Sequence, residues 1–267
     1  MKTTNKLLLA LIILTITISN LIANQYSFRK YLHVENFYKD ISQDAIELGV
    51  KNNIPPAAIM AIAGLESGYG RGYVAQITGN ILSLGAFKSD KELPSLYLPY
   101  SKSAKTVLFD PNEIKKHSKN DLVWKKRPKS LKRDYRPSPY AGTTKNIELL
   151  KYNKNLKEKA NKACINDFTT RWISESSNIK VFRDARVWLN NLVLKHGVKI
   201  LFTKKTNEAF IDIIGGHSNS FNYRKSWPKK VKLIMHKAGL VELSQDLYIN
   251  KINFKKSWRN KWLKKNN

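Results

Sequence analysis

The sequence has almost none of the side-chain arrangements that hold metals, disulfides or nucleotides. Its 267 residues include a single cysteine, Cys164, so no disulfide can form within the chain. The five histidines show no His-x-x-x-His spacing, and there is no glycine-rich phosphate-binding loop. We therefore expect no metal, nucleotide or other cofactor, and we interpret Cys164 as a small buried apolar residue.

Acidic side chains are also scarce. Lys and Arg number 48 against 20 Asp and Glu, which gives a formal net charge of +28. Such an excess attracts polyanions through interactions that salt weakens, so anionic cell-wall polymers, anionic lipid headgroups and nucleic acid all fit. The alternative interpretation is that lysine serves as the general solvating residue, without a dedicated anionic partner.

Long apolar runs are absent except near the start. Two lysines precede an uncharged run over residues 7–18, and a small residue, Ala23, lies near a possible cleavage point. This layout is typical of a secretory signal, so residues 1–23 are interpreted as a signal peptide or, if retained, as an N-terminal membrane anchor. We therefore expect export to the periplasm or cell envelope, which argues against nucleic acid as the physiological partner.

Apolar periodicity predicts mostly helices, at residues 37–50, 146–163, 181–194, 207–214 and 227–238. Residues 88–142 differ, because they carry many prolines and lysines and show no sustained period. We expect this basic insertion to be either an ordered lobe or a flexible loop.

A helix that ends in a glutamate is predicted over residues 55–66. Two prolines open the segment, where a missing backbone N–H costs little, and small or apolar residues follow up to Leu65. Gly68 and Gly70 then release the chain from the helix. Burial at the end of such a helix disfavours the charged form of a carboxyl group. Glu66 is therefore a candidate general acid for glycosidic bonds, the alternative being a surface glutamate beside a turn.

Four segments of the chain occur in an order that is typical of one known family. Residues 61–70 form an apolar run that ends in Glu-Ser-Gly-Tyr-Gly, and residues 78–86 contain Asn80 among apolar residues. Further on, residues 180–184 contain Phe-Arg, and residues 226–234 begin an aromatic-led helix. In this combination the chain resembles the bacterial glucosaminidases of glycoside hydrolase family 73, which are peptidoglycan hydrolases.

The resemblance implies a mainly α (α+β) fold, with a lysozyme-like helical domain and a small irregular or β-rich lobe over the cleft. Residues 24–247 would then form the catalytic domain, with the insertion at 88–142 in the lobe. Residues 248–267 would form a basic C-terminal tail, which is either an amphipathic end for an anionic surface or a frayed terminus.

The second catalytic group is less clearly marked. Members of the family often carry a further glutamate in the lobe, for which the candidates here are Asp90, Glu92, Asp110 and Glu113. They also often carry a Thr-x-Glu segment, where this chain has Arg171 in the place of the glutamate and Glu175 four residues on. This departure leaves two mechanisms open: a two-carboxylate mechanism through Glu175, and a substrate-assisted route in which the N-acetyl group of the sugar attacks the anomeric carbon.

The resemblance also implies an active-site tyrosine shortly before the last predicted helix. Spacing places it at Phe221, which has no hydroxyl, so Tyr223 is the candidate catalytic tyrosine and Phe221 a candidate for substrate contact. Tyr69 is a candidate for stacking on a sugar face, or else a core aromatic. Asn80 is a candidate for binding an acetamido group, or else caps a turn.

These features predict an exported enzyme that cleaves the β-1,4 bond after N-acetylglucosamine in peptidoglycan, with Glu66 as general acid. A lytic transglycosylase is one alternative, because that class shares the helix ending in Glu-Ser-Gly and needs a single acid. A non-catalytic wall-binding protein of the same fold is another, favoured by the irregular insertion and by Arg171. The expected partners are peptidoglycan glycan strands, with anionic envelope polymers or a lipid surface as further candidates and nucleic acid excluded.

Overall fold

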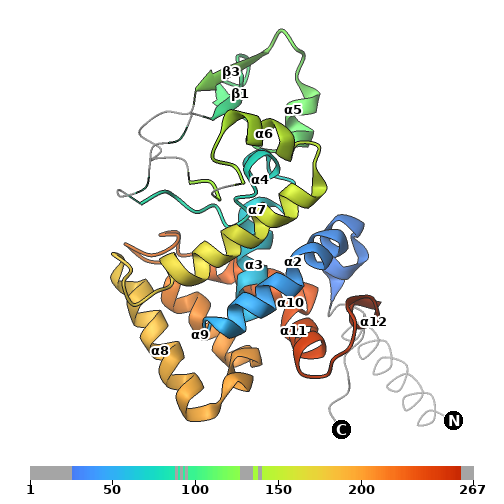
Figure 1. Cartoon of the computed structure of the whole chain (residues 1–267). Coiled ribbons are helices and arrows are strands. Elements are labelled where there is room, and N and C mark those ends of the chain that lie inside the picture. The colour runs from blue at the N-terminus through green and yellow to red at the C-terminus, as the bar shows by residue number, and fades with distance from the viewer. Residues whose placement is uncertain are drawn as a thin grey trace, which may run out of the picture.

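The computed structural model describes residues 26–87, 96–126, 135–137 and 140–259, together with Asp90 and Leu93. Helices make up 61% of it and the strands form one small antiparallel sheet, so the expected α+β class is confirmed. The helices form a body, and the sheet lies in a lobe at one end of it (Figure 1). The expected signal segment and the end of the tail from residue 260 lie outside the described residues.

In chain order, the first elements are η1 (Ser27–Lys30), α2 (Leu32–Lys51), α3 (Pro56–Ser67), α4 (Tyr73–Thr78), β1 (Tyr97–Ser101), β2 (Thr106–Val107), α5 (Pro111–Lys116) and β3 (Leu122–Lys126). The later elements are α6 (Thr144–Leu150), α7 (Lys154–Asp167), η3 (Phe168–Trp172), α8 (Lys180–His196), η4 (Val198–Phe202), α9 (Lys204–Ile214), α10 (Trp227–Ala238), α11 (Leu240–Tyr248) and α12 (Phe254–Arg259). The helices predicted at 37–50, 181–194, 207–214 and 227–238 are confirmed as α2, α8, α9 and α10.

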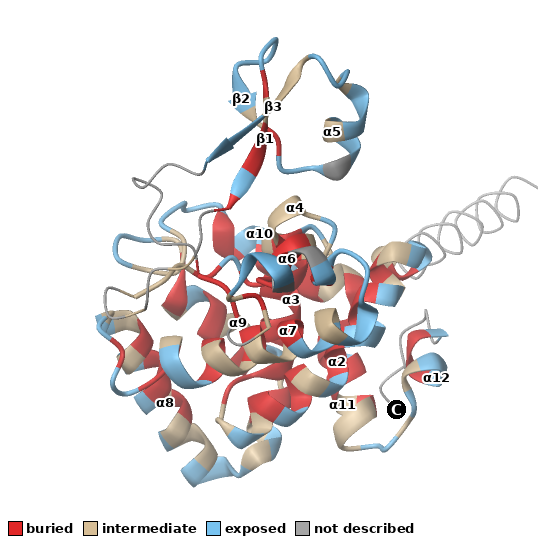
Figure 2. Cartoon of the chain, turned by 45° about the horizontal axis from the view of Figure 1, so that its top comes forward, coloured by how far each residue is buried: buried red, intermediate tan, exposed pale blue. Residues whose placement is uncertain are grey.

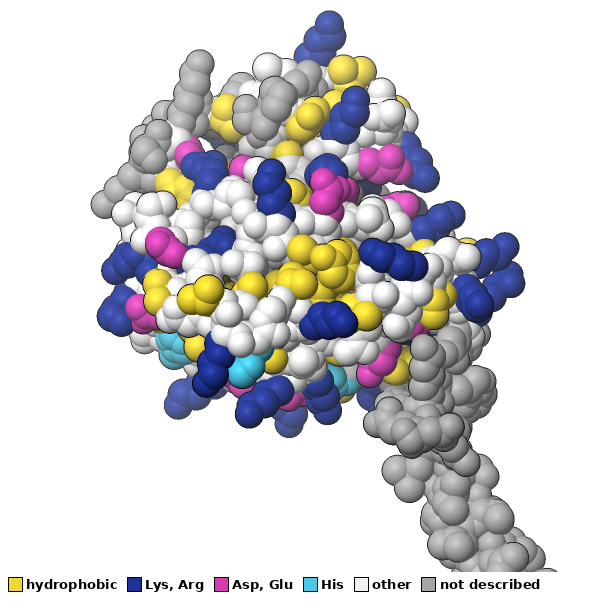
Figure 3. Space-filling view, turned by 60° about the horizontal axis from the view of Figure 1, so that its bottom comes forward, with side chains coloured by type: hydrophobic (Ala, Val, Ile, Leu, Met, Phe, Trp, Pro, Cys, Tyr) yellow, Lys and Arg dark blue, Asp and Glu magenta, His cyan; other side chains and the backbone are white. Residues whose placement is uncertain are grey.

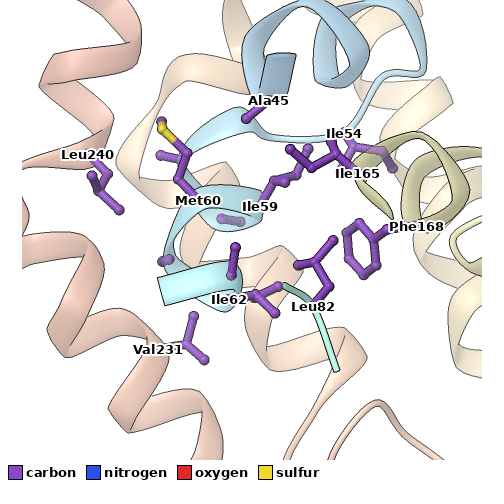
Figure 4. Packing of buried hydrophobic residues seen from close by; sticks show 14 of the residues in the cluster. Ala45, Ile54, Ile59, Met60, Ile62, Leu82, Ile165, Phe168, Val231 and Leu240 are labelled. Carbon is purple, nitrogen blue, oxygen red and sulfur yellow. The ribbon is translucent and has the colours of Figure 1, made fainter. Parts of the chain in front are cut away.

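Helix α3 lies at the centre of the body (Figure 2). All of its residues from Pro56 to Gly64 are buried, as expected for a helix that is apolar on every side. Helices α2, α9, α10 and α11 pack around it. Ile59, Met60 and Ile62 of α3 contribute to the buried cluster, which also draws side chains from the surrounding helices (Figure 4). The central position of α3 places its C-terminal end, and with it Glu66, against neighbours that are far away in the sequence.

The helix predicted over 146–163 is divided into α6 and α7. The break falls where Asn153 caps the start of α7, since its side-chain Oδ1 accepts a hydrogen bond from the Leu156 N–H at 2.9 Å. Asparagine favours such a cap over a place inside a helix, because its side chain satisfies one of the free N–H groups of the first turn. The periodicity was right about helical structure and wrong about its continuity.

The lobe is built on the antiparallel sheet, in which β1 is the central strand between β2 and β3. Asp121 joins two parts of the lobe, because its carboxylate accepts a hydrogen bond from Ser101 at 2.8 Å and lies 2.6 Å from Nδ1 of His117. The insertion expected at 88–142 therefore contains an ordered sheet. Its most basic run, residues 127–134, lies outside the described residues.

The described part of the C-terminal tail is docked on the body. Trp258 is 1% exposed and its ring centroid lies 5.8 Å from that of Tyr38. The buried Arg29 guanidinium donates to the carbonyls of Ser257 at 2.7 Å and Ala238 at 2.8 Å, the latter at the end of α10. These bonds satisfy carbonyls that the end of a helix leaves without partners. The tail is therefore part of the helical body up to residue 259, and a frayed terminus does not describe this stretch.

Candidate active site

A tight turn fixes the end of α3 at Glu66. The Ser67 hydroxyl donates to the Ala63 carbonyl at 2.6 Å and accepts a hydrogen bond from the Gly70 N–H at 2.8 Å. Gly68 ends the helix in the left-handed region at φ 56°, where a side chain would be strained. The sequence Glu-Ser-Gly-x-Gly thus has a local structural purpose, which is to turn the chain sharply just after the glutamate.

Glu66 lines a cavity of about 550 Å³ between the helical body and the lobe side of the molecule. We call this the Glu66 cavity. Its walls come from the end of α3, the start of α4, the loop after α4, the end of η3 and the loop before α10. Glu66 is the only carboxylate among the described residues that line it. The volume lies within the range of about 300–1,000 Å³ that is usual for ligand pockets.

Trp227, the first residue of α10, holds the Glu66 side chain. Its indole Nε1–H donates a hydrogen bond of 2.7 Å to Oε1 of Glu66, across 161 positions of sequence. Burial raises the pKa of Glu66, while the bond from Trp227 and the positive charge of Arg224 act in the opposite direction. The carboxyl group is therefore easier to protonate than an ordinary glutamate and is held in one orientation.

An aromatic wall lies beside this carboxyl group. The ring of Phe221 packs 5.4 Å from Trp227 and 6.2 Å from Trp172, measured between centroids. Gly215 allows the close approach of Trp227, since a Cβ at this position would lie 2.2 Å from the indole ring. Phe221 and Trp172 both line the Glu66 cavity, so the predicted contact residue Phe221 does lie beside Glu66.

Two of the predicted catalytic residues lie elsewhere. Tyr223 is 71% exposed and is not part of the cavity lining. Glu175 is exposed in the loop before α8, where its carboxylate accepts a hydrogen bond from Asn190 at 2.7 Å. The structure therefore does not bring Tyr223 or Glu175 to Glu66.

The other acidic candidates also have structural partners. Asp90 forms an ion pair with Arg171, the residue that stands in the place of the expected glutamate. Asp110 caps α5 by accepting from the Asn112 N–H at 2.8 Å. Glu113 pairs with a lysine one turn along the same helix. Glu92 lies outside the described residues.

Asn80 and Tyr69 have different positions relative to the cavity. Asn80 lines it, but its side chain is bonded to the backbone: Oδ1 accepts from the Leu84 N–H at 2.9 Å, and Nδ2 donates to the Leu84 carbonyl at 2.9 Å. It thereby shapes the loop after α4. Tyr69 lines a second cavity, and its ring packs edge-on against Phe37.

Sequence reasoning missed the residue that orients Glu66 and a buried residue of the cavity wall. Trp227 was recognised as the start of a helix, but nothing local indicated that its indole reaches Glu66. Tyr135 is 5% exposed, lines the cavity, and donates its hydroxyl to Asp167 at 2.7 Å. It follows the basic run of the insertion, where no periodicity was available to identify a buried position.

The chain matches no protein-family model, no curated protein and no solved structure in the comparisons with known proteins. Within the described ranges, no group of three His, Cys, Asp or Glu side chains is placed to hold a metal ion. No helix in this part of the chain has the length and apolarity needed to cross a bilayer. A functional assignment therefore depends on the geometry around Glu66 and on the order of the sequence segments.

Proposed function

We propose that this chain is an exported peptidoglycan hydrolase of lysozyme-like fold, which cleaves the β-1,4 bond after N-acetylglucosamine. The observation that carries the proposal is a carboxyl group at the end of a buried helix, facing a cavity of about 550 Å³ and oriented by a 2.7 Å hydrogen bond from Trp227. The order of segments shared with glycoside hydrolase family 73 supports the same assignment.

In this proposal, Glu66 donates its proton to the glycosidic oxygen as the bond to the anomeric carbon breaks. Burial raises the pKa of Glu66, which keeps the acid form present at higher pH and suits this step. A water molecule then adds to the anomeric carbon and returns a proton to Glu66, so one bond is hydrolysed per water consumed. The rings of Trp172 and Phe221 provide apolar faces for the sugar in the same cavity.

A lytic transglycosylase is the second candidate, and one observation favours it. Glu66 is the only carboxylate among the described residues that line the cavity, and a single acid suffices when a hydroxyl of the sugar itself attacks. The product then has an anhydro end in place of a reducing end. The same observation favours the substrate-assisted form of hydrolysis, in which the acetamido group replaces a second carboxylate.

Anionic envelope polymers or lipid surfaces are proposed as further partners. Lys and Arg side chains are spread over the face shown in Figure 3, around a central group of hydrophobic side chains. With a formal net charge of +28, the protein attracts polyanions, and salt weakens the attraction because the Debye length is about 10 Å at 0.1 M. Residues 1–23, as a signal segment, would place the protein in the periplasm or cell envelope.

The test is digestion of purified peptidoglycan by the full chain, with mass spectrometry of the released fragments. Glu66→Gln keeps the size of the side chain and its ability to accept from Trp227 but cannot donate a proton as an acid. Glu47→Gln is the matched control, because Glu47 is an exposed carboxylate on α2 that is outside the cavity lining.

Fragments with reducing N-acetylglucosamine ends, lost in Glu66→Gln and retained in Glu47→Gln, are the expected result. Fragments with anhydro ends would instead identify the activity as that of a lytic transglycosylase. A wild-type chain that binds peptidoglycan and releases no fragments would refute both enzymes and leave the wall-binding protein.

A further inference from the structure

A second cavity of about 750 Å³ opens between α2, α4, α7 and β3. We call it the α2–α7 cavity. Tyr73, at the start of α4, lines both this cavity and the Glu66 cavity. The two cavities are thus neighbours that share a wall, and the turn after Glu66 contributes Tyr69 and Gly70 to the second one.

Charged side chains of both signs face the α2–α7 cavity. Asp40 comes from α2 and Lys157 from α7, and neither side chain forms a hydrogen bond or an ion pair with another described residue. Lys157 is half-buried, and burial lowers the pKa of its ammonium group while the charge of Asp40 acts in the opposite direction. Lys154 and Glu158 add a further pair, 3.5 Å apart, at the same wall.

Exposed aromatic side chains also line this cavity. The rings of Tyr73 and Trp124 lie 5.7 Å apart, and Trp124 is 51% exposed. Tyr152 stands beside the cavity with 86% of its surface exposed. Large aromatic side chains left in contact with water around a concave site are typical of ligand-binding surfaces, where a ligand covers them.

Asn161 of α7 also lines this cavity, but its Oδ1 is inaccessible to solvent and has no hydrogen-bond partner among the described residues. This atom is therefore not counted among the groups that a ligand could contact. The cavity offers anionic side chains, cationic side chains and an apolar wall.

This combination distinguishes between ligand classes. A polyanion would be attracted by the three lysines among the lining residues but would be repelled by Asp40 and Glu158. A neutral sugar would gain from the aromatic wall but would form no ionic contact with Asp40 or Lys157. A ligand that carries both an amine and a carboxylate on an apolar stem uses all of these groups.

We propose that the α2–α7 cavity binds a short peptide that bears both a free amino group and a free carboxylate. Asp40 receives the amine, Lys157 receives the carboxylate, and Tyr73 and Trp124 cover the apolar part. The identity of this peptide rests on the proposed function: it is the peptide that branches from the glycan strand, and the wall shared at Tyr73 lets glycan and peptide occupy neighbouring cavities.

Binding is measured by calorimetry with the full chain carrying Glu66→Gln, so that no cleavage interferes. The probe is a peptidoglycan disaccharide that carries a tetrapeptide with one free side-chain amine and a free C-terminal carboxylate. The same disaccharide without peptide is the second probe. Two further probes have the amine acetylated or the carboxylate amidated.

The variants are Asp40→Asn and Lys157→Met, each with a matched control on its own helix. Asp44→Asn removes a carboxylate one turn further along α2, and Lys159→Met removes an exposed lysine of α7; neither residue lines the cavity. Charge-assisted hydrogen bonds at partly exposed sites are of modest strength. We therefore expect each cavity variant to bind the peptide-bearing probe about three- to tenfold more weakly, and the controls to bind it unchanged.

The acetylated and amidated probes, in which one charged group of the peptide is capped, show which group each side chain contacts. Asp40→Asn should weaken the uncapped probe and leave binding of the acetylated probe unchanged, whereas Lys157→Met should leave binding of the amidated probe unchanged. Equal affinity for the disaccharide with and without peptide would overturn the proposal in favour of a sugar site. Failure of either variant to affect the uncapped probe would overturn it as well.

This binding result is independent of the cleavage assay. Peptide binding with the expected dependence, in a wild-type chain that releases no fragments, would support the peptide site and refute the proposed enzyme. Cleavage by the chain with intact Glu66, together with peptide binding that does not depend on Asp40 or Lys157, would support the proposed enzyme and refute the peptide site.

Discussion

Replacing Trp227 by phenylalanine removes one hydrogen bond from Glu66 and keeps an aromatic ring beside it. The indole N–H now stabilises the charged form of the carboxylate through a bond of 2.7 Å. Its loss therefore raises the pKa of Glu66. A hydrogen bond to a charged group contributes about 1.5–3 kcal/mol, and water replaces part of it, because Glu66 is only partly buried. We expect the ratio of protonated to charged Glu66 to rise by about three- to tenfold at a given pH.

The assay is the pH dependence of kcat/KM on solubilised peptidoglycan. A general acid must be protonated, so activity falls as pH rises through the pKa of Glu66 in the free enzyme. In Trp227→Phe this fall should move to higher pH, even though loss of orientation lowers the maximum rate. Trp188→Phe is the matched control, because Trp188 is a half-buried tryptophan on α8 outside the cavity lining.

Thermal unfolding of both variants accompanies the pH profiles, because the smaller ring leaves a space next to Gly215 and costs about 1–3 kcal/mol of stability. The reasoning is refuted if Trp227→Phe is folded and active and its profile stays in place or moves to lower pH. Either outcome would mean that Glu66 is not the group whose protonation limits the reaction, or that Trp227 does not stabilise its charged form.

Three further predictions concern stability. Glu66→Gln should raise the free energy of unfolding at pH 7, because the raised pKa of Glu66 makes its ionisation oppose folding. Urea titrations should find no such gain below about pH 4, where the glutamate is protonated in the unfolded chain as well. Arg29→Met should cost about 3 kcal/mol or more, since it leaves buried carbonyls without donors, and a loss under about 1 kcal/mol would contradict this. Gly79→Ala should destabilise strongly, because its Cβ would lie 2.4 Å from Cβ of Ala160. Gly68→Ala is the control, because Gly68 also lies in the left-handed region and its Cβ would have no atom within 4 Å, so its midpoint isolates the backbone strain.

Much of the candidate site followed from local sequence. The helix that ends at Glu66 and the turn after it were predicted, because prolines, apolar residues and glycines each restrict the backbone where they stand. The helix that begins at Trp227 was predicted from its apolar periodicity, which is also a local property. These features act over a few residues, so they can be recognised without knowing the rest of the sequence.

The partners of Glu66 were decided by packing. Tyr223 and Phe221 are two residues apart in one loop, and only the course of that loop placed Phe221 in the cavity and Tyr223 in solvent. Glu175 was assigned by distance along the chain from a motif, but its loop directs it to Asn190. Spacing along an irregular segment does not determine direction in space, because loops have no period.

The sequence by itself determined the class of the fold, the end of α3 at a glutamate, and the excess of positive charge. The tertiary structure alone decided that Trp227 reaches Glu66 across 161 positions, that Arg171 pairs with Asp90, and that Asp40 and Lys157 face one cavity. The physical reason is the distance along the chain over which each effect acts. Backbone preferences and apolar periods are properties of neighbouring residues. Contacts between helices depend instead on how buried surfaces fit together, and that fit is defined only once the whole body has packed around α3.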